Sequence, residues 1–277
     1  MKVFIINMAK DVRRKKDMQN QFDKLDLDVE FFEGANGKLI PPDEFSKIAA
    51  IEKLEDKEKR PISELKGMVG CTYSHYLIYQ KMINENIEVA CVLEDDIILA
   101  SDFGDYLSYI EKQIRKNEII SLHTLLYNPI LLNSDRRKYK ECEIMTPEPP
   151  KIRGTQGYVI TNYCATQLAE EMMPIKEFPD CFNRYHLFCE DVQIRVLFPF
   201  IIRHMWVDSV RDEKSSTFKN LINMIQTYRV FPLWNWIRSR RRSINDKFIH
   251  QFIIIDKQPA RHIYLRELTK IRFFSKL

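Results

Sequence analysis

Short apolar runs and helical apolar spacings alternate along the first part of this chain. Residues 3–6 and 29–32 are two such runs, and each predicts a short strand. Between them Met18, Phe22 and Leu25 recur at spacings of four and three, which predicts a helix with one buried face. The second strand runs into Gly-Ala-Asn-Gly at 34–37, a composition typical of a turn. The chain is therefore predicted to begin as β-α-β.

The same alternation continues to about residue 207. Residues 43–60 are highly charged and predict a surface helix that ends before Pro61, because the residue before a proline disfavours the α region. The apolar positions from Val69 to Ile83 have mostly helical spacing, and a further helix is expected at 162–173. Strands are predicted at 89–93, 119–126, 157–161 and, interrupted by Pro199, 198–207. Strands that alternate with helices indicate an α/β sheet flanked by helices.

Glycine is scarce, and this excludes two common phosphate-binding devices. The 277 residues include only 7 glycines, and neither G-x-x-x-x-G-K-[ST] nor G-x-G-x-x-G occurs. A phosphorylated ligand would have to be neutralised in another way. With 45% hydrophobic and 30% charged residues, the chain has the composition of an ordinary globular protein.

The cysteines and the first residues suggest a cytoplasmic protein. The six cysteines form no C-x-x-C pair, and several lie in apolar runs, where cysteine behaves as a small hydrophobe. Only four or five apolar residues precede the first charges, too few for the core of a signal peptide. No apolar run approaches the roughly 18 residues of a membrane span.

Charge divides the chain into an acidic part and a basic part. Residues 1–200 contain 27 Lys+Arg and 33 Asp+Glu, whereas residues 201–277 contain 16 and 6, so the net charge of +4 combines −6 with +10. We predict a catalytic or binding domain at 1–216 and a mainly helical, basic, aromatic-rich extension at 217–277. Arginines beside Trp234 and Trp236 favour adsorption to an anionic membrane surface. Packing of the extension on the core, or nucleic-acid binding without a recognised module, are the alternatives.

Three consecutive carboxylates carry the strongest chemical signal. Glu94, Asp95 and Asp96 follow the buried strand 89–93, at the strand end where open α/β sheets bind ligands. Alternation along an extended chain would point Glu94 and Asp96 to one side and Asp95 to the other. Two converging carboxylates suit Mg²⁺ or Mn²⁺, which could then hold a diphosphate. A solvated loop, or a helix N-terminus that favours acidic residues, is the competing interpretation.

A second candidate is the segment Gly67-Met-Val-Gly-Cys-Thr-Tyr-Ser-His75. A glycine turn is expected to present Ser74 and His75 near the start of a helix. Because neighbouring side chains on a helix do not face each other, ligand hydrogen bonding is favoured over a nucleophile and base pair. The alternative is that both are ordinary helix residues with satisfied hydrogen bonds.

Together these motifs resemble glycosyltransferase family 25, the bacterial lipopolysaccharide and lipooligosaccharide biosynthesis glycosyltransferases. Its V-x-V-I-N-L strand, arginines and A-x-D-G turn correspond to residues 3–8, 13–14 and 35–37. Its G-x-x-G-C-x-x-S-H and L-E-D-D motifs correspond to 67–75 and 93–96, and looser elements correspond to 157–168, 178–180 and 198–199. The resemblance spans roughly residues 1–216.

The resemblance implies a GT-A type fold and transfer of a hexose, most often galactose, from a UDP-sugar to a lipid-linked glycan. It makes Glu94 and Asp96 the ligands of Mn²⁺ or Mg²⁺. Nucleotide contacts would come from Asn7, Arg13, Ala35, Ser74, His75 and Asp95. Inversion at the anomeric carbon would need a general base, for which Asp180 is the first candidate and Asp191 the second, although Asp191 could instead belong to an acidic pair at a helix N-terminus.

Such an enzyme would work at the inner face of the bacterial inner membrane, with no nucleic-acid partner. A non-catalytic module that binds a nucleotide sugar or a glycan is the alternative. Six of the seven glycines form pairs three residues apart, Gly34/Gly37, Gly67/Gly70 and Gly154/Gly157. We expect these pairs to mark places where backbone lies close to the ligand.

Overall fold

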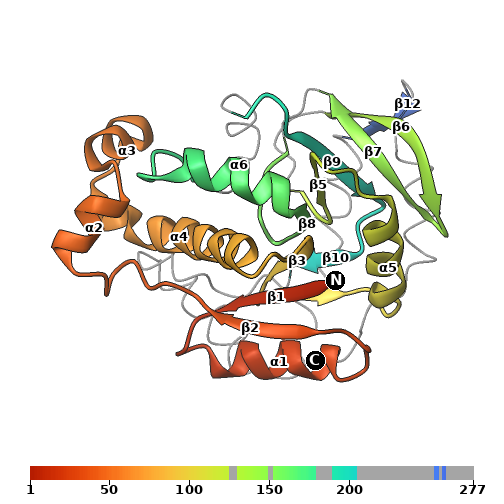
Figure 1. Ribbon diagram of the computed structural model, residues 1–277, viewed down its shortest axis with the longest axis horizontal. Coiled ribbons are helices and arrows are strands. Elements are labelled where there is room, and N and C mark those ends of the chain that lie inside the picture. The colour runs from red at the N-terminus through yellow and green to blue at the C-terminus, as the bar shows by residue number, and fades with distance from the viewer. Residues whose placement is uncertain (125–129, 149–151, 179–188, 205–252, 256–257, 260–277) are drawn as a thin grey trace, which may run out of the picture.

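The structure is a computed structural model of the whole chain. It describes residues 1–124, 130–148, 152–178, 189–204, 253–255 and 258–259. Figure 1 shows a central sheet with helices on both of its faces.

The main sheet is mixed, with the strand order β12-β11-β6-β7-β9-β5-β8-β3-β1-β2. β1 pairs in parallel with both β2 and β3, whereas β8 is antiparallel to its neighbours β3 and β5. A separate pair joins β4 to β10. The strands are β1 (Lys2–Asn7), β2 (Val29–Glu33), β3 (Val89–Glu94), β4 (Ile97–Leu99), β5 (Glu118–Ser121), β6 (Ile130–Tyr139), β7 (Cys142–Glu148), β8 (Gly157–Thr161), β9 (Gln193–Phe198), β10 (Ile202–His204), β11 (Ile253–Ile255) and β12 (Gln258–Pro259).

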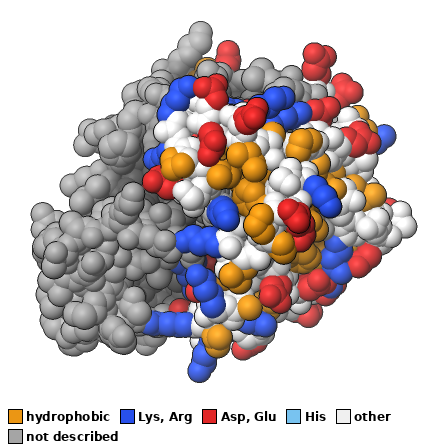
Figure 2. Space-filling model, turned by 90° about the vertical axis from the view of Figure 1, so that its left-hand side faces the viewer, with side chains coloured by type: hydrophobic (Ala, Val, Ile, Leu, Met, Phe, Trp, Pro, Cys, Tyr) orange, Lys and Arg blue, Asp and Glu red, His pale blue; other side chains and the backbone are white. Residues whose placement is uncertain are grey.

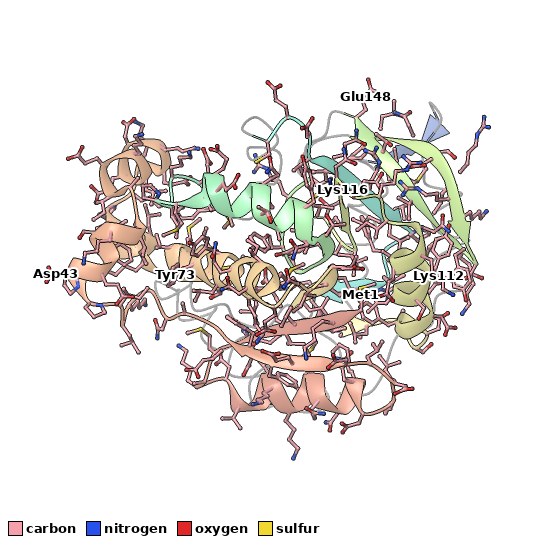
Figure 3. All side chains as sticks on the ribbon, viewed as in Figure 1. Met1, Asp43, Tyr73, Lys112, Lys116 and Glu148 are labelled. Carbon is pink, nitrogen blue, oxygen red and sulfur yellow. The ribbon has the colours of Figure 1, made fainter. Side chains whose placement is uncertain are left out.

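Helices cover the two faces of this sheet in separate layers. On one face α4 (Ile62–Asn84) and α6 (Asn162–Met172) bury Ile78, Met82 and Leu168 against the strands. On the other face α1 (Val12–Phe22) and α5 (Phe103–Gln113) form a second core. Lys112 of α5 points outward at one end of the molecule, as Asp43 does at the other (Figure 3). The predicted α/β class with flanking helices is confirmed.

The charged segment 43–60 is two short helices rather than one surface helix. α2 (Pro42–Ile48) and α3 (Ile51–Glu58) are separated at Ala49, which bridges to Ile175. Phe45 and Leu54 are buried in a third cluster with the first turns of α4. Figure 2 views this end of the molecule and shows charged side chains of both signs around apolar ones. The apolar positions are few but correctly spaced, so the charge content concealed a buried face.

Most predicted elements are present, with shifted ends. The strand at 157–161 and the helix at 162–173 agree with β8 and α6 to within one residue. α4 begins seven residues before the predicted Val69, so Gly67 and Gly70 lie inside a helix and not in a turn. The strand expected at 198–207 instead ends at Phe198, before Pro199, and a separate strand follows at 202–204.

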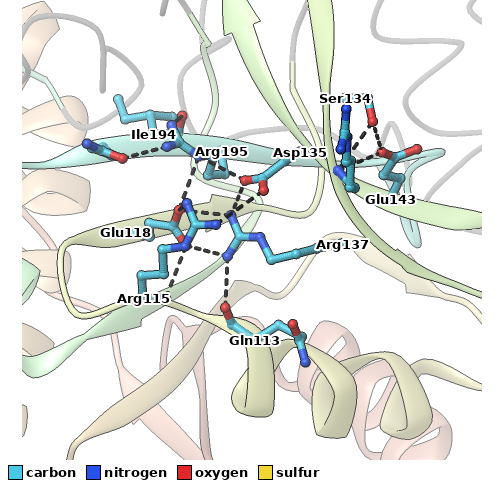
Figure 4. Close-up of polar contacts among 11 residues, drawn as sticks. Gln113, Arg115, Glu118, Ser134, Asp135, Arg137, Glu143, Ile194 and Arg195 are labelled. Atoms are coloured by element: carbon cyan, nitrogen blue, oxygen red, sulfur yellow. Dashed lines mark hydrogen bonds and ion pairs between the residues drawn. The ribbon is translucent and has the colours of Figure 1, made fainter.

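A buried ion cluster joins three strands on the side of the sheet away from β1 (Figure 4). Glu118 of β5 is fully buried and accepts two hydrogen bonds from the Arg137 guanidinium, at 2.7 and 2.8 Å. Asp135 also pairs with Arg137, and Arg195 of β9 lies 3.2 Å from Glu118. The acidic and basic groups therefore compensate one another across β5, β6 and β9.

The predicted extension at 217–277 lies almost wholly outside the described residues. Its five described residues form β11 and β12, and β11 pairs in parallel with β6. This short part of the extension therefore belongs to the main sheet, while its helical content and the boundary at 216 stay predictions. Within the described part of the chain, no helix is both long and apolar enough to cross a membrane.

Candidate functional site

The predicted site residues gather at one edge of the main sheet. β1 ends at Asn7, β2 leads into Gly34 and Ala35, and β3 ends at Glu94. Because these three strands are parallel, their carboxyl ends meet at the same edge. β8 runs the opposite way, so the residues just before Gly157 lie at this edge as well. This is the edge at which open α/β sheets bind ligands.

Asp95 is held by two side chains from the first β-α unit. Its Oδ2 accepts a hydrogen bond of 2.7 Å from the Asn7 amide, and its Oδ1 accepts one of 3.0 Å from Arg14. Burial raises the pKa of the Asp95 carboxyl above its ordinary value, although Arg14 and Asn7 act against this rise. Two residues predicted to contact the nucleotide, Asn7 and Asp95, are therefore bonded to each other.

The arginine that reaches this cluster is Arg14, not the predicted Arg13. Arg13 is exposed on α1, whereas Arg14 is largely covered and lies 3.0 Å from Asp95 and 3.9 Å from Asp96. The sequence contained a signal for this choice. Arg14 precedes the buried Met18 by one helical turn, so it lies on the face of α1 that packs on the sheet.

Asp96 is buried and contacts His204 of β10. His204 Nε2 lies 3.1 Å from Asp96 Oδ2, and the other oxygen, Oδ1, has no hydrogen-bond partner among the residues that the structure describes. Burial acts to raise the pKa of the Asp96 carboxyl, but His204 and Arg14 outweigh it, so that pKa lies below its ordinary value. His204 was not predicted, since only the pairing of β10 with β4 brings it to the site.

Glu94 contacts the segment that precedes β8. Its Oε1 accepts a hydrogen bond of 2.7 Å from the Thr155 hydroxyl, and its backbone N–H donates to the Gln156 carbonyl. β3 ends at Glu94, so strand alternation does not continue through Asp95 and Asp96, and Arg14 contacts both. The predicted separation of Asp95 from Asp96 is therefore wrong.

His123 is a further buried polar residue of this region. It follows β5 and stacks at a tilt on Phe200, with ring centroids 5.2 Å apart. Burial and the nearby His204 lower the pKa of His123 to about 4. His123 is therefore neutral at physiological pH, beside the charged pair of Asp96 and His204.

Ser74 and Ala35 join α4 to the turn after β2. The Ser74 hydroxyl accepts a hydrogen bond of 2.8 Å from the Ala35 N–H and donates one to the Gly70 carbonyl within the helix. Gly70 and Gly37 lie in backbone contact, because a Cβ added to Gly70 would be 2.5 Å from the Gly37 nitrogen. This glycine pair thus allows two segments of the chain to approach each other, which is not the ligand contact expected from the sequence.

His75 is fully buried on α4 and belongs to a chain of aromatic hydroxyls. Its Nδ1 lies 2.7 Å from the Tyr158 hydroxyl, which in turn lies 2.8 Å from that of Tyr79. Burial raises the pKa of both tyrosines, so both hydroxyls keep their protons at neutral pH. Potential ligand atoms of Cys71, His75 and Glu94 all lie within 4.8 Å of one another.

The two candidate general bases are not brought to this cluster by the described residues. Asp180 lies outside them, so its role stays a prediction. Asp191 is exposed in a turn before β9, where its carbonyl accepts a hydrogen bond from Asn117. The strand registers place the start of β9 level with the start of β3, so Asp191 is at the opposite edge of the sheet from Glu94.

Comparison with known proteins gives this arrangement a family. Residues 1–183 match the model of glycosyltransferase family 25, described as an LPS biosynthesis protein. A glycosyltransferase 25 family member of Aedes aegypti is 30% identical over 196 residues, which are 66% of this chain and 31% of that protein. Procollagen galactosyltransferase 2 of Homo sapiens is 25% identical over 199 residues, 66% of this chain and 30% of that protein.

The match therefore spans about a third of the length of these relatives. It includes the acidic segment, the α4 motif and the strands that carry them. This chain belongs to glycosyltransferase family 25.

Proposed function

We propose that this protein is a metal-dependent transferase that moves a hexose, galactose in the first instance, from a UDP-sugar to a lipid-linked lipopolysaccharide or lipooligosaccharide glycan. Family membership supports glycosyl transfer, and the name of the human relative supports galactose. The observation that carries the proposal is the acidic segment at the carboxyl edge of β3, with Asp96 Oδ1 buried and without a hydrogen-bond partner among the described residues.

The carboxylates fit a hard divalent cation. Glu94 and Asp96 offer oxygen ligands, which Mn²⁺ and Mg²⁺ prefer, and the orphaned Asp96 Oδ1 needs a partner of positive charge or a donor. When bound, the ion would act as a Lewis acid that stabilises negative charge on the departing UDP. Arg14 and Asn7 hold Asp95 in place and prevent the three carboxylates from repelling one another without compensation.

The remaining roles belong to parts of the chain outside the described residues. Asp180 is proposed to take the proton from the acceptor hydroxyl, since the family resemblance places it in the P-x-D element. The basic, aromatic-rich residues 228–277 are proposed to contact the anionic surface at the cytoplasmic face of the inner membrane, where a lipid-linked acceptor would be found.

A donor screen tests the proposal. UDP release is measured with UDP-galactose, UDP-glucose and their N-acetyl forms, each with Mn²⁺ and with a chelator. We expect Mn²⁺-dependent release that is greatest with UDP-galactose. No release or transfer with any donor, combined with tight UDP binding, would favour the non-catalytic module instead.

Matched variants test the site within the same assay. Asp96→Asn should abolish Mn²⁺-dependent UDP binding, whereas Asp43→Asn, exposed at the far end of the molecule, should not change it (Figure 3). UDP binding that is independent of metal and survives Asp96→Asn would rule out Asp96 as a metal ligand.

A further inference from the structure

The α4 motif includes two side chains that differ in chemistry from the carboxylate cluster beside them. Cys71 and His75 are four residues apart on α4, so they lie on one face of the helix, one turn apart. Glu94 at the end of β3 approaches the same place, and one ligand atom from each of the three lies within 4.8 Å of the others. The proposed hexosyl transfer uses Glu94 but gives no role to the thiol.

We propose that Cys71, His75 and Glu94 form a binding site for a thiophilic divalent cation of the zinc class. A thiolate, an imidazole and a carboxylate are ligands that Zn²⁺ accepts together, whereas Mg²⁺ and Mn²⁺ favour oxygen. Three protein ligands with an open fourth position are the pattern of zinc sites that keep a water or a substrate group. The site is distinct from the Glu94 and Asp96 pair, although it shares Glu94 with that pair.

The spacing suits such an ion. Metal–ligand bonds of about 2.0–2.3 Å in a tetrahedron place ligand atoms roughly 3.5 Å apart. The observed limit of 4.8 Å therefore requires movements on the order of 1 Å, which side-chain rotation supplies. Cys71 is only partly buried, so its side chain has room to move.

The environment of His75 supports a metal-binding role. The hydrogen bond between Nδ1 and the Tyr158 hydroxyl fixes the ring and leaves Nε2 as the coordinating nitrogen. Tyr158 can accept the Nδ1 proton while it donates to Tyr79, and this arrangement gives Nε2 its lone pair. Metal-binding histidines commonly have their second ring nitrogen held in this way.

The shared glutamate has a consequence that rests on the proposed function. A zinc-class ion bound to Cys71 and His75 would draw Glu94 away from the ion that holds the diphosphate. We therefore expect Zn²⁺ to inhibit Mn²⁺-dependent UDP release, and we expect Cys71→Ser to relieve this inhibition.

Cobalt titration tests the site without reference to activity. Co²⁺ is added to the reduced, chelator-treated full chain, and the near-ultraviolet absorbance that arises from a thiolate–Co²⁺ bond is followed. We expect one equivalent to saturate this band, Zn²⁺ to remove it, and Cys71→Ser to abolish it. Cys189→Ser is the matched control and should retain it, since Cys189 is buried beside α6.

Further variants separate the outcomes. Tyr158→Phe should weaken Co²⁺ binding by about 10-fold to 100-fold, the usual effect of removing such a supporting hydrogen bond. Asp96→Asn should keep the cobalt band although it loses Mn²⁺-dependent UDP binding. If Cys71→Ser unfolds, Glu94→Gln provides the same test through weaker binding.

A missing band in the wild-type chain, or a band that survives Cys71→Ser, would overturn the proposed site. A normal band in a chain that is inactive with every UDP-sugar would overturn only the proposed function.

Discussion

Two glycines of α4, three residues apart, are predicted to respond oppositely to the same substitution. Gly70→Ala places a Cβ 2.5 Å from the Ala35 carbonyl oxygen and 2.5 Å from the Gly37 nitrogen, whereas Gly67→Ala places one where no atom lies within 4 Å. Both residues are inside one helix, so the intrinsic gain in helix propensity is the same for each. The difference between the variants therefore reports the contact between α4 and the turn at 34–37.

The expected magnitudes follow from this geometry. Gly67→Ala should stabilise the protein by about 1 kcal/mol, the usual gain for this change inside a helix. Gly70→Ala has the same gain but must displace backbone by about 1 Å, and overpacking of this kind costs about 1–3 kcal/mol. Displacement also breaks the hydrogen bond from Ala35 to Ser74, worth about 1 kcal/mol. We therefore expect the two variants to differ by about 2–4 kcal/mol.

Urea unfolding at equilibrium measures this difference, provided that the slope with denaturant is the same in both variants. Gly37→Ala serves as a second test from the other side of the contact, because its Cβ would overlap the Lys66 carbonyl. It should also destabilise the protein. If Gly70→Ala proves as stable as Gly67→Ala, the contact between the two glycines does not constrain the fold and the argument fails.

The remaining predictions concern buried charge, pH and the donor site. Arg137→Met leaves Glu118 buried without its main partner and should lower the free energy of unfolding by about 3–5 kcal/mol; Arg137→Met combined with Glu118→Gln should recover much of this, and a double variant as unstable as the single one would contradict it. Because His123 has a pKa of about 4 in the folded chain and 6.5 as its ordinary value, its contribution to stability is complete above pH 6.5 and falls by about 3 kcal/mol as the pH falls to 4. Urea unfolding of the metal-free protein at several pH values should show a shallower loss in His123→Asn, and an unchanged slope would refute this. In UDP titrations with Mn²⁺, Arg14→Gln should weaken binding while the adjacent Arg13→Gln leaves it nearly unchanged; equal effects would contradict the placement of Arg14 on the carboxylates.

Local pattern was sufficient for the alternation of strands and helices. The apolar run at 89–93 could only be buried from both sides, and it became the strand between β1 and β8. The carboxylates that follow it were recognised because a change from apolar to acidic residues at a strand end is visible in the sequence. In contrast, the charged α2 and α3 were expected on the surface, because the burial of Phe45 and Leu54 depends on α4 packing against them.

The sequence by itself determined the class of fold, the family resemblance and the segments that carry the site, since these depend on residue type and near spacing. Only the tertiary structure decided which side chains meet. It brought Arg14 to Asp95 in place of Arg13, His204 to Asp96 from a strand more than one hundred residues away, and Cys71 to Glu94 from a helix on one face of the sheet. The physical reason is that helix rotation and strand pairing set these contacts, and both are fixed by packing across the whole sheet rather than by neighbours in the chain.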